Sequence, residues 1–81
     1  MFTVYILESI KIGKFYVGCT NDIVRRIKEH NANKTRSLKN RGPFKLIYQE
    51  NFNTLSEGRN RELQIKSYKG GNAFKKLIMR A

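Results

Sequence analysis

One strand-to-helix stretch in the first half of the chain constrains the fold most, because a strand-forming segment runs directly into a helix-forming one. Residues 15–17 are aromatic or β-branched and predict a short strand that ends at Gly18. Thr20, Asn21 and Asp22 follow, and each side chain can accept a hydrogen bond from the first free N–H groups of a helix. Any of these three residues can therefore be the N-cap.

The helix predicted after this turn is amphipathic. At ~100° of rotation per residue, Ile23, Val24 and Ile27 form one apolar arc. Arg26 and His30 lie at the margin of the arc and, being four residues apart, are neighbours on one face. A cation and an imidazole at the edge of a buried face can overlook a cleft.

Length and charge limit the class of protein. The chain of 81 residues, 40% of them hydrophobic, is expected to form a single domain over residues 1–81. Its 17 lysines and arginines against six acidic residues give a formal net charge of +11. Self-repulsion of this size indicates a polyanionic partner, with nucleic acid as the leading candidate and an anionic membrane as the second.

The composition also argues against several cofactors and locations. Cys19 is the only cysteine, which excludes an internal disulfide and is typical of the reducing cytoplasm, where we expect the protein. One cysteine and one histidine cannot build a zinc site of the usual spacing. Residues 2–7 are too short an apolar run for an export signal or a membrane span, so neither is expected.

Residues 2–7 are instead rich in β-forming side chains and predict a strand that pairs as a hairpin with the strand from residue 15. In the predicted register Tyr5 lies opposite Tyr16, with both phenols on one face. The other face then carries Val4, Ile6, Phe15 and Val17. The two tyrosines are either a structural cross-strand pair or part of a site.

Gly18 alternates with Tyr16 and so shares the tyrosine face of the predicted sheet. The missing side chain there either lets a backbone or a ligand come close, or marks a bulge or the end of the strand.

Residues 31–45 combine turn-forming residues with cations. The cations are Lys34, Arg36, Lys39, Arg41 and Lys45. A basic polar loop is most often a solvated surface, but next to a nucleic-acid site it supplies phosphate contacts. The overall charge of +11 favours the second interpretation.

The second half of the chain predicts one strand and two helices. The strand covers residues 44–50, and a capping box between Thr54 and Glu57 opens the first helix. A glycine pair breaks that helix, and helical spacing resumes over residues 73–79. The order β-β-α-β-α-α predicts an α/β fold with a small three-stranded, largely antiparallel sheet flanked by helices.

Glu62 is anomalous on the first of these helices. By helical rotation it lies within ~60° of each of three small or apolar residues. These are Leu55, Gly58 and Ile65. A carboxylate at the centre of an apolar stripe is costly unless it is paired or bound to a cation. Glu62 is therefore either half of a salt bridge, with Arg26 or a lysine, or a metal ligand.

Two triplets resemble the paired Gly-Ile-Tyr and Tyr-Ile-Gly motifs of the GIY-YIG nuclease family: Thr3-Val4-Tyr5 and Tyr16-Val17-Gly18. Further matches follow in the family's order, at Arg26, His30, Glu62 and Asn72. The chain is similar to small stand-alone bacterial members related to the N-terminal domain of the excinuclease C subunit. Thr3 replaces the first glycine of the motif, a departure that bears on cleavage rather than on the fold.

The resemblance implies a role for each of the matched residues. Glu62 would hold one divalent metal ion, Mg²⁺ or Mn²⁺, that stabilises the leaving 3′ oxygen. Arg26 would clamp the scissile phosphate through its planar guanidinium. Tyr5, Tyr16 or His30 would take the proton from the attacking water, and these three stay open as alternatives.

The predicted function is a divalent-metal-dependent endonuclease that hydrolyses phosphodiester bonds in nucleic acid, expected to be DNA in a repair or recombination context. The expected catalytic residues are Tyr5, Tyr16, Arg26, His30 and Glu62. The expected nucleic-acid contacts are Lys34, Arg36, Lys39, Arg41 and Asn72. The alternative is a catalytically weak or inactive binding module that keeps the fold and the basic surface. A nucleophile pair of Cys19 and His30 is disfavoured, because no third orienting group is apparent.

Overall fold

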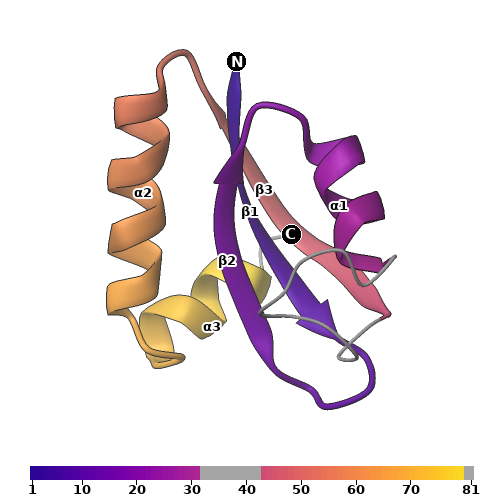
Figure 1. Ribbon diagram of the computed structural model, residues 1–81. Helices are drawn as coiled ribbons and strands as arrows, with labels where there is room; N and C mark the ends of the chain where they lie inside the picture. Colours follow the sequence, from indigo (N-terminus) through magenta and orange to yellow (C-terminus); the bar gives the residue numbers. More distant parts are fainter. Residues whose placement is uncertain (32–42, 80–81) are drawn as a thin grey trace.

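A computed structural model describes residues 1–31 and 43–79 (Figure 1). The elements are β1 (Phe2–Ser9), β2 (Phe15–Thr20), α1 (Ile23–Asn31), β3 (Phe44–Phe52), α2 (Leu55–Ser67) and α3 (Asn72–Met79). The strands form one antiparallel sheet in the order β2-β1-β3, so β1 is central. The predicted α/β fold and its order of elements are confirmed. None of the helices described in these two ranges is long and apolar enough to cross a membrane.

Helices cover both faces of the sheet, with α1 on one face and α2 and α3 on the other (Figure 1). The core under α2 and α3 consists of Val4, Ile6, Ile65 and Phe74. The core under α1 consists of Tyr5, Leu7 and Phe44, with Ile23 and Ile27 packed against it. β1 supplies alternate side chains to the two cores, as a strand buried on both faces must.

The register of the β1–β2 hairpin differs from the predicted one. Tyr5 pairs with Gly18, and Leu7 pairs with Tyr16. A shift by an even number of residues leaves each side chain on its own face, so Tyr5 and Tyr16 still share a face although they are not opposite. The prediction that the second strand ends at Gly18 is also wrong, since β2 continues to Thr20.

The turn between the strands explains the error in register. The N–H of Ser9 donates to the carbonyl oxygen of Lys14 at 2.8 Å, and the N–H of Gly13 donates to the carbonyl oxygen of Ser9 at 2.8 Å. Gly13 therefore lies inside the turn, and Glu8 pairs with Phe15, whereas the predicted register placed residue 8 opposite residue 13. A longer first strand and a later turn move every pairing partner along β2.

Asp22 is the N-cap of α1. Its Oδ1 accepts a hydrogen bond from the N–H of Arg25 at 3.0 Å, which satisfies one of the free donors of the first turn. The Thr20 hydroxyl accepts from the N–H of Asp22 at 3.1 Å and so holds the capping residue in place. Of the three candidates predicted from the sequence, the structure selects Asp22.

The buried face of α1 is rotated from the predicted apolar arc. Val24 is 61% exposed, whereas His30 is only 4% exposed. Ile23 and Ile27 are half-buried against the core that contains Tyr5. The contact with the sheet, rather than hydropathy alone, decides which side of the helix is inside, and it places His30 there.

The N-cap of α2 predicted at Thr54 is confirmed, and Glu57 returns a contact to the side chain of Thr54 rather than to its backbone N–H. The N–H of Glu57 donates to the Thr54 hydroxyl at 3.2 Å, and that hydroxyl donates to the Glu57 carboxylate at 3.0 Å. The apolar stripe predicted around Glu62 is correct for Gly58 and Ile65, which are buried, but wrong for Leu55, which is 42% exposed. Leu55 begins the helix, beyond the part of α2 that packs on the sheet.

Candidate active site

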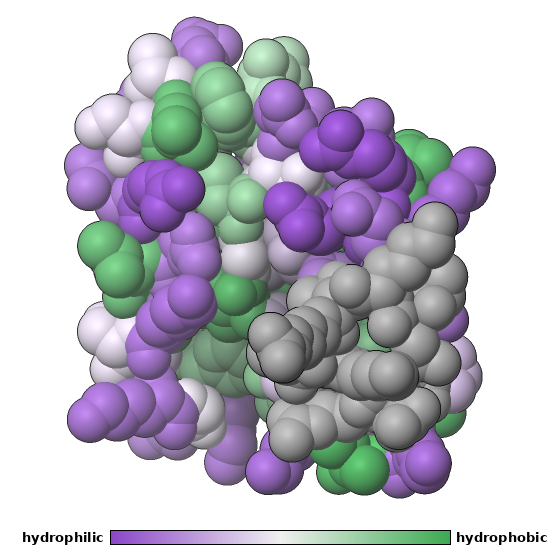
Figure 2. All heavy atoms as spheres, in the orientation of Figure 1, coloured by the Kyte–Doolittle hydropathy of each residue, from purple (hydrophilic) through white to green (hydrophobic). Residues whose placement is uncertain are grey.

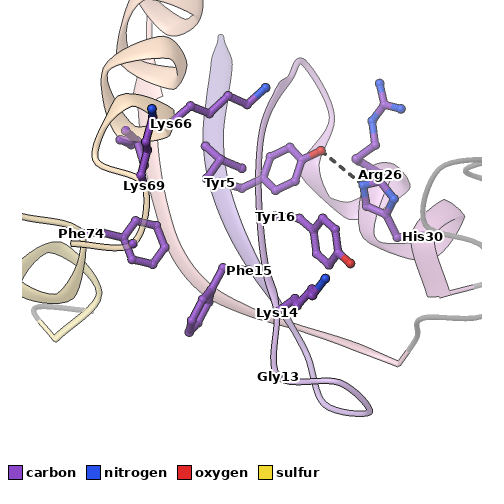
Figure 3. Close-up of a pocket in the computed structure, with 13 residues that line it drawn as sticks. Tyr5, Gly13, Lys14, Phe15, Tyr16, Arg26, His30, Lys66, Lys69 and Phe74 are labelled. Atoms are coloured by element: carbon purple, nitrogen blue, oxygen red, sulfur yellow. Dashed lines mark hydrogen bonds between the residues drawn. The ribbon is translucent and has the colours of Figure 1, made fainter.

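A cavity of about 820 Å³ lies along β2, an edge strand of the sheet (Figure 3). Residues of β1, β2, α1, α2 and α3, of the turn between β1 and β2, and of the segment between α2 and α3 line it. On this side of the molecule, apolar residues lie in a hollow between hydrophilic surfaces (Figure 2). Four of the residues predicted from the sequence line the cavity: Tyr5, Tyr16, Arg26 and His30. The fold therefore brings two strands and α1 together in one site.

Tyr5 and His30 form the centre of this site. The phenol oxygen of Tyr5 lies 3.3 Å from Nε2 of His30, and the two residues are only 6% and 4% exposed. The dashed line in Figure 3 marks this hydrogen bond between β1 and α1. The phenol donates when Nε2 carries a lone pair, and accepts when Nε2 carries the proton.

Burial keeps both members of this pair neutral. Burial raises the pKa of the Tyr5 phenol, and the positive charge of Arg26 opposes this effect only in part. Burial lowers the pKa of His30, and the nearby Arg26 lowers that pKa further, against a smaller opposing effect of Glu29. At neutral pH the site thus holds a protonated phenol and an uncharged imidazole.

Two buried nitrogen atoms of the site lack a hydrogen-bond partner among the residues that the structure describes. Within residues 1–31 and 43–79, neither Nδ1 of His30 nor Nε of Arg26 has a hydrogen-bond partner. A buried polar atom left without a partner costs about 1–3 kcal/mol. Both atoms belong to residues that line the cavity, so hydrogen-bonding groups of a ligand can satisfy them.

Gly18 gives Tyr5 its place in the site. A Cβ atom added to Gly18 would lie 2.6 Å from Cζ of Tyr5, closer than any side chain tolerates. The missing side chain thus makes room for the phenol ring of the neighbouring strand, rather than for a ligand or a bulge. Tyr16 lies on the same face, where its ring packs edge-on against Phe44 with centroids 5.6 Å apart.

Glu62 approaches the site from α2. Its side chain is 17% exposed, and Oε2 lies 2.7 Å from Nζ of Lys66, one helical turn further on. A salt bridge with a lysine was one of the two interpretations of Glu62, and the structure contains that salt bridge. Glu62 is absent from the cavity lining, whereas Lys66 is part of it. The negative charge of Glu62 still contributes to the raised pKa of Tyr5.

A metal ion at this position would have one protein carboxylate as ligand. Within the described residues, no group of three or more Cys, His, Asp or Glu side chains could hold a metal. Mg²⁺ keeps several waters and commonly takes one or two carboxylates together with phosphate oxygens of a substrate. Glu62 fits this requirement, because a single hard oxygen donor suffices when a nucleic-acid phosphate completes the shell.

The remaining predicted contacts lie apart from the cavity or outside the described residues. Asn72 is the first residue of α3 and is exposed, and it is not among the lining residues. Lys34, Arg36, Lys39 and Arg41 lie outside the described residues.

Sequence reasoning missed several residues that line the cavity. Three are cations and two are aromatic: Lys14, Lys66, Lys69, Phe15 and Phe74. The spacing of Lys66 four residues after Glu62 was a usable signal, since an i,i+4 pair on a helix is close enough to form a salt bridge. Lys69 and Phe74 reach the cavity because α3 lies next to β2, and no local sequence pattern predicts that position of α3.

Comparisons with known proteins agree with the motifs. The model of the GIY-YIG catalytic domain matches residues 1–75. The UPF0213 protein of Staphylococcus saprophyticus is 41% identical over 66 residues, which cover 80% of this chain and 79% of that protein. A UPF0213 protein of Haloquadratum walsbyi is also 41% identical over 66 residues, covering 80% and 73%.

A solved structure supports the same assignment. The solution NMR structure of a UPF0213 protein from Bacillus halodurans has a TM-score of 0.55 and 34% sequence identity to this chain. The match covers 99% of this chain and 84% of the other. The resemblance found in the two triplets is therefore confirmed, and the chain belongs to the GIY-YIG family of nuclease domains.

Proposed function

We propose that the protein is a divalent-metal-dependent endonuclease that hydrolyses phosphodiester bonds, with DNA as its substrate in a repair or recombination context. The observation that carries this proposal is the convergence of Tyr5, His30 and Arg26 in one cavity. A hydrogen-bonded phenol–imidazole pair beside a guanidinium provides a proton acceptor and a phosphate clamp in one place. Family membership supports a nucleic acid as the substrate.

Arg26 would bind the phosphate that is cleaved. A guanidinium presents two parallel N–H donors that match two phosphate oxygens. Lys14, Lys66 and Lys69 also line the cavity, so the site carries four cations without counting those of the surrounding surface. This concentration of positive charge attracts a polyanionic chain and holds it over Tyr5 and His30.

Tyr5 and His30 would together accept the proton of the attacking water. The raised pKa of Tyr5 makes a free phenolate rare at neutral pH. The neutral His30 offers a base whose Nε2 lies within hydrogen-bond distance of the phenol oxygen. The phenol can thus take a proton from water as it passes its own proton to Nε2, so neither group needs to be charged beforehand. Tyr16 remains the alternative base.

Glu62 is the residue that would hold the metal ion, Mg²⁺ or Mn²⁺. When bound, the ion supplies Lewis-acid stabilisation of the negative charge that develops on the leaving oxygen. Until then, the salt bridge to Lys66 compensates the charge of Glu62. Lys66 is itself half-exposed, so its side chain can leave the carboxylate and contact a phosphate instead.

A binding module without turnover is the second candidate, because Thr3 replaces a glycine of the family motif. The position of Thr3 weakens this alternative. Thr3 is 8% exposed, its hydroxyl donates to Oδ1 of Asn51 at 2.8 Å, and it is not among the cavity-lining residues. The threonine is thus accommodated within the β1–β3 pair, away from the cavity.

A cleavage assay tests the proposed function. Linear, branched and flapped DNA would be incubated with the protein in Mg²⁺ or Mn²⁺, with EDTA as the control. We expect cleavage that depends on the metal and that Glu62→Gln abolishes. Glu50→Gln is the matched control, because Glu50 also forms a salt bridge, with Arg61 on α2, and does not line the cavity. Absence of cleavage of every substrate, with DNA binding retained, would instead support the binding module.

A further inference from the structure

The cavity has an aromatic end that the proposed chemistry does not use. Phe15 begins β2 and is 41% exposed although its ring belongs to the cavity wall. Its ring meets the buried ring of Phe74 edge-on, with centroids 5.2 Å apart and planes at 63°. Phe74 therefore supports one side of the Phe15 ring, and part of that ring stays accessible from the cavity.

Cations flank this aromatic end. Lys14 precedes Phe15 in the chain, and Lys69 lies on the segment that leads into α3, and both residues line the cavity. Figure 3 shows Lys69 close to Phe74, with Phe15 between them and Lys14. Tyr5, Tyr16 and His30 lie on the α1 side of β2 in the same view. The aromatic end therefore lies on the α2/α3 face of the sheet, and it meets the candidate active site of the α1 face around the edge strand β2.

An aromatic platform between two cations has the chemistry that binds a single nucleotide unit. An aromatic ring stacks on the face of a nucleobase of any sequence, and lysines on either side neutralise the adjoining phosphates. The cavity that contains this end and the candidate active site measures about 820 Å³ in all, and ligand sites of several hundred Å³ are typical. In an intact duplex both faces of every internal base are already stacked, so only an unpaired or displaced base can reach the platform.

We propose that Phe15, supported by Phe74, is a stacking platform for an unpaired nucleobase next to the scissile phosphate, with Lys14 and Lys69 binding the flanking phosphates. This inference rests on the proposed function and restricts the class of substrate. It assigns single-stranded or locally opened nucleic acid as the substrate class of the site. Phe15 then selects nucleic acid that has an unpaired base. Arg26 and the Tyr5–His30 pair act on any phosphate that is placed between them.

The test is a binding measurement in EDTA, where no metal-dependent cleavage occurs. Fluorescence anisotropy would compare a short strand of thymidines, an abasic strand of equal length and charge, and a duplex of equal length. We expect the wild type to bind the thymidine strand about 5- to 50-fold more tightly than the abasic strand. Phe15→Leu should lose this preference while its affinity for the abasic strand is unchanged, and Phe15→Trp should keep it.

Ile12→Ala is the matched control, because Ile12 lies in the same hairpin, is 44% exposed and does not line the cavity. It should bind all three ligands like the wild type. Equal affinity of the wild type for the thymidine and abasic strands would overturn the platform alone. The platform would also be overturned if Phe15→Leu, shown by a thermal melt to be folded, still bound the thymidine strand more tightly than the abasic strand. A wild type that binds none of the three ligands would contradict the proposed function itself.

Discussion

The phenol ring of Tyr5 occupies the space that a side chain at position 18 would fill. Gly18 is the β2 partner of Tyr5, and a Cβ atom there would lie 2.6 Å from Cζ of the phenol. The same phenol reaches Nε2 of His30 at 3.3 Å. The last residue of the second family triplet thus positions the last residue of the first, and through it the contact between β1 and α1.

Gly18→Ala should therefore move Tyr5 away from His30. We expect a loss of about 1–3 kcal/mol in the free energy of unfolding, because the added methyl group must displace a buried ring. Chemical denaturation would measure this loss. The loss should shrink in a Tyr5→Leu background, where the phenol is absent, so a double-mutant cycle reports the coupling between the two positions. Equal losses in both backgrounds would show that Gly18 acts on something other than Tyr5.

The order of strands and helices was predictable because the signals for it are local. The capping box between Thr54 and Glu57 and the β-forming residues of β1 depend only on neighbours in sequence. The hairpin register was not predictable, because it depends on which residue closes the turn. The exposure of Val24 was not predictable either, because helical spacing gives the width of an apolar arc but not its rotation against the sheet.

The candidate site was predictable only where the motif is local. The spacing of the two triplets leads to Tyr5 and Tyr16, and the i,i+4 relation leads from Arg26 to His30. The aromatic end could not be found in this way. It exists because the segment after α2 brings Phe74 beside Phe15, which is a contact between residues far apart in the chain.

The chain has one histidine, so the titration of His30 can be followed without ambiguity. Burial and Arg26 lower its pKa, with Glu29 opposing and the uncharged Tyr5 as its hydrogen-bond partner. We expect an NMR titration midpoint below the ordinary imidazole pKa of about 6.5. As the pH falls below that ordinary value, the unfolded chain binds a proton that the folded chain does not, so the folded state should lose stability. The loss ends below the pKa of His30 in the folded protein, where both states bind the proton.

Chemical denaturation at several pH values measures how the free energy of unfolding depends on the titration of His30. Below about pH 6.5 and down to the folded pKa, the wild type should lose at most about 1.4 kcal/mol per pH unit from this group. His30→Gln should remove that part of the slope, because an amide does not titrate. A midpoint at or above the ordinary value would mean that the imidazole is not held in its neutral form.

Glu62→Gln should have little effect on the metal-free protein. Its partner Lys66 is half-exposed, so the substitution leaves no buried cation without a counter-charge, and we expect a change within about 1 kcal/mol. Any rise in melting temperature on addition of Mg²⁺ or Mn²⁺ should disappear in this variant. Thermal melts with and without metal measure both effects. A variant that keeps the metal-dependent rise would place the metal elsewhere.

Lys66→Met tests the same salt bridge from the other side. Removing a cation that lies 2.7 Å from the Glu62 carboxylate should tighten divalent-metal binding, as measured by calorimetry. Lys75→Met is the matched control, because Lys75 is exposed on α3 and does not line the cavity. Equal metal affinities for the two variants would show that Lys66 does not compete with the metal.

Nucleic-acid affinity should fall steeply with salt concentration, in proportion to the number of phosphates that the protein neutralises. Replacing Lys34, Arg36, Lys39 and Arg41 by serine should flatten this dependence without unfolding the domain. Anisotropy titrations over a range of salt concentrations measure the slope, with thermal melts as the control for folding. Binding that is indifferent to salt would contradict an electrostatic role for these four cations.

The most direct test of the central claim is the single-turnover rate of DNA cleavage by Arg26→Lys, compared with the wild type. Lysine keeps the charge but loses the two-donor fork, so the rate should fall about 100-fold while affinity for DNA changes little. Arg25→Lys is the matched control, since Arg25 lies on the same helix, exposed and paired with Glu29, and should cleave at the wild-type rate. Equal rates for Arg26→Lys and the wild type would mean that Arg26 does not bind the scissile phosphate and that the cavity is not the active site.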